Sequence, residues 1–252
     1  MAQVPAPRPP GRIRAYFQHS AEPSQAAALT LPLLCLYGLG VLLVPAVRNG
    51  VDFVSVVLYS AFQSLGSLRA FGYLTFYGLL IGANIGLISY LSKKKKFHVR
   101  YFAPLIGEST VYAVATGNLS AAITANLTDI FHAVPALAVN REFGLIDGIF
   151  VSAGAGLHEE LVFRLVGIAG VGRVLFGAGW QRPGVRLLLL VLASSVLFSA
   201  VHHIVEPFVF TTFLFRVVAG LLFAALFLLR GFAVAAWTHF LYDVWVIVLL
   251  GA

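Results

Sequence analysis

The sequence predicts an all-α membrane protein, a polytopic transmembrane helical bundle of about seven to eight spans. Hydrophobic residues make up 60% of the chain and charged residues only 11%, whereas a soluble domain has roughly 45–50% and about 25%. The apolar residues also form runs close to the roughly 17–25 residues that cross a bilayer as a helix. These observations exclude a soluble globular domain. They also argue against nucleic-acid binding, although the net charge is +7.

The N-terminal region, residues 1–26, is predicted to be a disordered cytoplasmic tail. It is rich in proline and alanine and carries Arg8, Arg12 and Arg14, and basic residues favour the cytoplasmic side of a membrane. No clear small-residue cleavage site follows the first apolar run, so we expect that run to remain as an anchor. The single cysteine, Cys35, excludes a disulfide framework within the chain.

An N-terminal transmembrane region is expected over residues 27–143. Residues 31–47 form the first predicted span and residues 71–91 the next. The four lysines at 93–96 place the end of that second span in the cytoplasm. The apolar run between them, residues 51–68, is interrupted by polar residues near one helical face, which favours an interfacial or re-entrant helix. Counting it as a span would put one of the two basic clusters outside.

The following segment, residues 101–117, is predicted to cross outward and carries Glu108. Residues 118–140 are mixed in polarity and are predicted to form an exterior loop with an amphipathic helix. The rest of the chain, residues 144–252, is expected to be a second transmembrane region. Its predicted spans are residues 144–168, 187–205, 208–229 and 232–250.

Three charged side chains, Glu159, Glu160 and Arg164, stand inside the first of these C-terminal spans. A charge in hydrocarbon costs roughly several kcal/mol, so it persists only when it is paired or used. Glu160 and Arg164 are four residues apart with the acid first, which favours a supporting ion pair on one helix face. Glu159 is rotated by about 100° and cannot share that partner equally well. It is therefore left free for chemistry.

Two later spans carry further ionisable residues at membrane depth. His202 follows Phe198 by one helical turn, and His239 precedes Asp243 by the same spacing. Glutamate and histidine are the side chains that transfer protons near neutral pH once burial has tuned them. Three helices therefore each offer acid–base groups that would converge inside the bundle.

These residues resemble the CPBP family of glutamic-type intramembrane proteases, which includes the CAAX prenyl proteases and many bacterial relatives. The resemblance covers roughly residues 144–250. It rests on three motifs in the order of the family, Glu159-Glu160-x-x-x-Arg164, Phe198-x-x-x-His202 and His239-x-x-x-Asp243. The last position is often Asn in the prenyl proteases, and an Asp side chain donates a hydrogen bond only when it is protonated.

The resemblance implies a peptidase mechanism and assigns a role to each motif. Glu159 with His202 would activate a water for attack on a peptide carbonyl of a membrane-associated protein or peptide. His239, assisted by Asp243, would stabilise the tetrahedral oxyanion. No cofactor is required by this chemistry. Zinc remains an alternative, with Glu159, His202 and His239 as ligands and a free position for water.

The expected partners are the lipid bilayer and a membrane-associated substrate, with no nucleic acid. We expect an integral membrane protein with a cytoplasmic N-terminus, and the Ala-, Pro- and Arg-rich tail favours the bacterial cytoplasmic membrane. Two other functions remain open. A proton-coupled transporter also keeps ionisable residues at membrane depth, and a non-catalytic scaffold or immunity protein would keep the fold.

Overall fold

The computed structural model describes residues 11–44, 49–52, 66, 68–94, 97–130, 144–204 and 206–249, and every regular element in these ranges is helical. The α-helices before residue 144 are α1 (Arg12–Ser20), α2 (Pro23–Leu43), α4 (Leu68–Lys93) and α5 (Phe102–Ile130). Those after it are α6 (Leu145–Gly154), α7 (Val171–Phe176), α8 (Val185–His202), α9 (Phe210–Arg230) and α10 (Phe232–Asp243). The all-α prediction is confirmed.

Within the described ranges, five helices are long and apolar enough to cross a membrane: α2, Leu74–Lys93 of α4, the continuous helix Leu145–Gly179, α8 and α9. A shorter apolar helix, Phe232–Val248, follows them. Many large apolar side chains on these helices face outward, such as Leu79 at 69% and Leu229 at 77% exposure. Such a surface would be unfavourable in water. A polytopic membrane bundle accounts for it.

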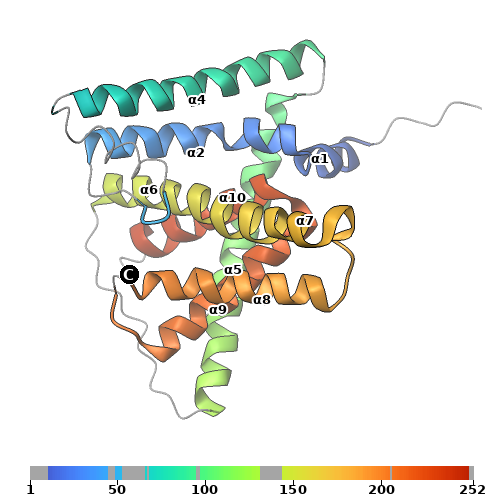
Figure 1. The fold of residues 1–252 in the computed structure, drawn as a ribbon, viewed down its shortest axis with the longest axis vertical. Coiled ribbons are helices and arrows are strands. Elements are labelled where there is room, and N and C mark those ends of the chain that lie inside the picture. Colours follow the sequence, from blue (N-terminus) through green and yellow to red (C-terminus); the bar gives the residue numbers. More distant parts are fainter. Residues whose placement is uncertain are drawn as a thin grey trace, which may run out of the picture.

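Helix α10 lies at the centre of the bundle. It packs against α2, α5, α6 and α9 and against the middle of the helix that joins α6 to α7. Ala233, Ala235 and Ala236 are fully buried, and these small side chains let the surrounding helices approach closely. Figure 1 shows α4, α2, α6 with α7, and α8 running side by side, while α5 passes across them.

The N-terminal tail departs from the prediction of disorder over residues 1–26. Residues 12–20 form α1, and α2 already begins at Pro23, eight residues before the expected start of the first span. Arg230 at the end of α9 holds α1 in place: it donates to the Phe17 carbonyl at 3.3 Å and to Ser20 Oγ at 3.1 Å. These contacts join residues about 210 positions apart, which local composition does not reveal. Residues 1–10 lie outside the described ranges.

The exterior loop with an amphipathic helix that was predicted over residues 118–140 begins as a continuation of a long helix, because α5 runs to Ile130. Ser120, Thr124 and Thr128 recur every four residues and are all buried. Part of the polarity of this stretch therefore belongs to a buried helical face, while Asn118 and Asn126 are exposed on the same helix. Residues 131–143 and most of the predicted interfacial segment, residues 51–68, are outside the described ranges.

Candidate active site

The first motif lies in a π-helical part of the long helix between α6 and α7. Ala155–Glu159 and Leu161–Gly170 both have π-helical hydrogen bonding. Such i→i+5 turns are rare and occur frequently at functional sites. The helix also approaches α10 closely here, because a Cβ atom on Gly156 would lie 2.6 Å from the Ala236 carbonyl oxygen. The two adjacent carboxylates, Glu159 and Glu160, are thereby brought against α10.

The expected ion pair between Glu160 and Arg164 is present, and both side chains are fully buried. Arg164 Nη1 lies 3.3 Å from Glu160 Oε1, and Nη2 donates to the Gly220 carbonyl of α9 at 3.1 Å. The guanidinium also lies 4.5 Å from the centre of the Phe198 ring, a cation–π distance. Arg164 therefore joins three helices as well as neutralising a carboxylate.

Glu160 has a second partner that the spacing did not predict. His239 Nδ1 donates to Glu160 Oε1 at 2.8 Å, which leaves Nε2 of the same ring to face the opposite way. The imidazole is stacked on Phe223 at a centroid distance of 4.4 Å, and its edge meets Phe198 at 5.8 Å. The orientation of His239 is therefore set on three sides.

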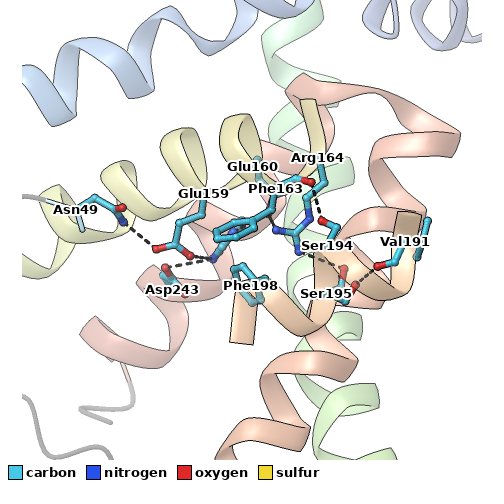
Figure 2. Close-up of polar contacts among 12 residues, drawn as sticks. Asn49, Glu159, Glu160, Phe163, Arg164, Val191, Ser194, Ser195, Phe198 and Asp243 are labelled. Atoms are coloured by element: carbon cyan, nitrogen blue, oxygen red, sulfur yellow. Dashed lines mark hydrogen bonds and ion pairs between the residues drawn. The ribbon is translucent and has the colours of Figure 1, made fainter. Parts of the chain in front are cut away.

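The Glu159 carboxylate lies near both His202 and His239. Its Oε2 lies 3.8 Å from His202 Nε2 and 3.9 Å from His239 Nε2. Its other oxygen, Oε1, accepts a hydrogen bond from Asn49 Nδ2 at 2.8 Å. Figure 2 shows this carboxylate between Asn49 and Asp243. The distances to the histidines exceed a direct hydrogen bond and suit a bridging water.

The second and third motifs complete the cluster. His202, the last residue of α8, donates Nδ1–H to the Phe198 carbonyl at 2.8 Å, so Nε2 is the ring nitrogen that faces Glu159. Asp243 Oδ2 lies 3.7 Å from His239 Nε2. The structure thus brings together all four residues that the sequence predicts to be catalytic, Glu159, His202, His239 and Asp243, from three helices.

Residues 141–245 match the family model for type II CAAX prenyl endopeptidase Rce1-like proteins. The match covers 105 of the 252 residues, so it shows what this part of the chain is similar to. The match contains all three motifs and confirms the predicted CPBP-type resemblance. No curated protein and no solved structure matches the chain. The remainder, including α2, α4 and α5, lies outside the Rce1-like region.

Two other ionisable residues, Glu108 and Arg216, form ion pairs with residues outside this cluster. Glu108 binds Arg230 at 2.6 Å and also accepts a hydrogen bond from the Tyr16 hydroxyl. Arg216 binds Glu206 at 2.8 Å.

Sequence reasoning missed Asn49 and Phe223. Asn49 precedes the Rce1-like region by about ninety residues and stands in a short polar stretch after α2. That stretch, Asn49-Gly50-Val51-Asp52, was the only available signal, and it carries no periodicity. Phe223 is one of several aromatic residues in an apolar helix. Nothing in the sequence separates it from ordinary packing.

A zinc site in this cluster would need donor atoms at the spacing that zinc imposes. Within the described parts of the chain, no three or more His, Cys, Asp or Glu side chains are grouped as metal ligands. The nearest set is the Glu159 oxygen with the two imidazole nitrogens, at 3.8 and 3.9 Å. Two ligands of a tetrahedral zinc with bonds of about 2.0–2.1 Å are separated by roughly 3.3 Å. As arranged, these side chains do not fit a zinc ion.

Proposed function

We propose that this protein is an intramembrane endopeptidase that hydrolyses a peptide bond of a membrane-associated protein or peptide. The observation that supports this most directly is the convergence of Glu159 Oε2 with Nε2 of His202 and Nε2 of His239 in a buried cluster. The family match adds that the region is of a protease class. The roles of individual residues are our proposal.

Water activation falls to Glu159 and His202. In the proposed resting state, Glu159 Oε2 and His202 Nε2 are both hydrogen-bond acceptors, so neither can donate to the other. They lie 3.8 Å apart, which leaves room for a water that contacts both. Each can accept one proton of the same water, which fixes the orientation of that water. As the water oxygen attacks the carbonyl carbon of the substrate, one of its protons passes to Glu159.

Oxyanion stabilisation falls to His239, with Asp243 beside it. Because Glu160 accepts the Nδ1 proton of His239, a protonated imidazole presents Nε2–H toward the reaction centre. That N–H would donate to the oxygen of the tetrahedral intermediate. Asp243, 3.7 Å from the same nitrogen, would stabilise the imidazolium. When the intermediate collapses, the C–N bond breaks and Glu159 returns its proton to the leaving amine.

This chemistry requires no metal. The proposed reaction follows from the residues of the cluster, but the class of substrate does not. Its only support is the family description, which names CAAX prenyl endopeptidases. We propose a prenylated C-terminal peptide as one candidate and sorting tails or peptide precursors as others. A bacterial cytoplasmic membrane and a cytoplasmic N-terminus are part of the same proposal.

The test of this proposal is the substitution Glu159→Gln, which replaces one carboxylate oxygen of the proposed base by an amide nitrogen. Glu159→Gln is nearly isosteric and can still accept hydrogen bonds, but it cannot take a proton from water. Membrane-associated proteins from cells that carry the wild-type protein or Glu159→Gln are compared at their termini by mass spectrometry. We expect uncut precursors to accumulate only with the variant, at equal membrane levels of the two proteins. Matching terminal profiles under several growth conditions would overturn the proposed function.

A further inference from the structure

Asn49 makes the shortest contact to the proposed catalytic carboxylate, although it lies far outside the Rce1-like region. Its side-chain Nδ2 donates to Glu159 Oε1 at 2.8 Å, across 110 residues of sequence. The oxygen that faces the two histidines is the other one, Oε2. The Asn49 amide therefore makes the two oxygens of Glu159 unequal: one is held and the other faces the reaction centre.

The short segment that carries Asn49 is itself tied to the bundle. The Asn49 backbone N–H donates to the Tyr37 hydroxyl at 3.1 Å, and that hydroxyl donates to Asp52 at 2.7 Å. Asn49 Oδ1 accepts the backbone N–H of Val51 at 2.9 Å, which closes the turn. Both side-chain polar atoms of Asn49 are thus used, one for the turn and one for Glu159.

A second contact fixes this segment to the helix of the first motif. Asp52 Oδ1 lies 3.6 Å from His158 Nε2, and His158 is the residue directly before Glu159. The His158 ring also packs on Tyr37 at 4.4 Å between centroids. Gly154, one turn earlier, permits this approach, because a Cβ there would lie 2.6 Å from the Tyr37 ring. Tyr37, Asn49 and Asp52 therefore hold Glu159 from the N-terminal half of the chain.

We propose that Asn49 is a positioning residue that keeps Glu159 Oε2 directed at His202 and His239. This inference rests on the proposed peptidase function. A carboxylate side chain has free rotation about its last bonds unless a partner holds it. Without the Asn49 donor, Glu159 would spend part of its time with neither oxygen correctly placed for the water. The consequence is a slower chemical step rather than weaker substrate binding.

Two substitutions separate this role from support of the turn. Asn49→Asp keeps an oxygen that accepts from Val51 N–H but puts a carboxylate oxygen where the donor stood. Two carboxylates so close either repel or share one proton, and both outcomes disturb Glu159 as a base. Asn49→Ala loses both contacts without introducing repulsion. If Asn49 positions Glu159, Asn49→Asp is the more damaging change. If it only supports the turn, Asn49→Ala is the more damaging one.

The experiment measures kcat and KM of the full-length protein in detergent or proteoliposomes, on a precursor peptide identified with the Glu159→Gln comparison. A hydrogen bond to a charged group corresponds to roughly a 10- to 100-fold effect. We expect kcat to fall about tenfold for Asn49→Ala and about 100-fold or more for Asn49→Asp, with KM within about threefold. Asn118→Asp is the matched control, because Asn118 is exposed on α5 and its amide bonds the Val114 carbonyl of its own helix at 2.8 Å.

Tyr37→Phe provides a second variant if either Asn49 variant is poorly folded. It keeps the ring that packs on His158 but removes the hydroxyl that binds the Asn49 backbone. We expect a smaller fall in kcat, with KM again unchanged. Wild-type kcat in both Asn49 variants, or a larger loss in Asn49→Ala than in Asn49→Asp, would overturn the inference. Full activity of Glu159→Gln would instead refute the peptidase function itself.

Discussion

The Glu160–Arg164 pair can be removed in a way that separates its contribution to stability from its contribution to catalysis. Glu160→Gln leaves a fully buried guanidinium without its carboxylate. Breaking a buried pair from one side typically costs about 3–5 kcal/mol. The Gly220 carbonyl and the Phe198 ring remain as partners of Arg164. We therefore expect the lower end, about 3 kcal/mol of lost unfolding free energy.

The double variant Glu160→Gln with Arg164→Met should recover most of that loss. Arg164 Nε and Nη1 and Glu160 Oε2 are buried without a hydrogen bond in the described structure, so the pair offsets its own desolvation poorly. Replacing such a pair by apolar or neutral groups is often neutral or stabilising. We expect the double variant to lie within about 1 kcal/mol of wild type.

We expect the double variant to regain unfolding free energy without regaining kcat. In Glu160→Gln the new amide oxygen would still accept the Nδ1–H of His239, but it carries no charge to stabilise the His239 imidazolium that we propose as the oxyanion donor. A charged hydrogen-bond partner contributes roughly 1.5–3 kcal/mol, so we expect kcat to remain about 10- to 100-fold below wild type. Unfolding free energy is measured by SDS titration in mixed micelles, and kcat on the identified substrate. A double variant that is as unstable as Glu160→Gln, or fully active, would refute the reasoning.

Three other predictions concern the packing at Gly156, the need for zinc and the contacts of Arg230. Gly156→Ala should lower the Tm by many degrees or prevent folding, since its Cβ would lie 2.6 Å from the Ala236 carbonyl, whereas Gly78→Ala, with open space around it, should not. Proteolysis should survive zinc chelators with less than a twofold change; reversible loss, restored by zinc, would contradict the metal-free proposal. Arg230→Met should expose residues 12–22 to limited proteolysis, because three of its contacts hold α1 and α5 together; an unchanged cleavage pattern would show that α1 is held by other contacts.

The sequence predicted the helical class and the cluster of acid–base residues because both depend on charge and apolarity along the chain. Glu159, His202 and His239 are conspicuous in apolar spans since each would be costly there without a partner. The spacing rule likewise predicted the Glu160–Arg164 pair, which the structure contains. These are local signals, readable within one or two helical turns.

Features that depend on distant residues were not predictable in the same way. The tail was expected to be disordered from its composition, yet α1 is held by Arg230 at the end of α9. Asn49 lies in a short turn with no periodic pattern, and its partner Glu159 is 110 residues away. In both cases the decisive contact joins residues that are far apart in the sequence. A short stretch of sequence contains only one of the two contacting residues.

The two adjacent carboxylates show how local and tertiary information combine. Regular α-helix geometry turns consecutive side chains by about 100°, which suggests that only one of Glu159 and Glu160 faces a given neighbour. The structure instead places both against His239: Glu160 at Nδ1, 2.8 Å away, and Glu159 at Nε2, 3.9 Å away. The π-helical turns around them contain more residues per turn, so successive side chains diverge less. One imidazole can then be held by the carboxylate that Arg164 neutralises while it faces Glu159, an arrangement that the proposed mechanism uses and that one glutamate alone could not provide.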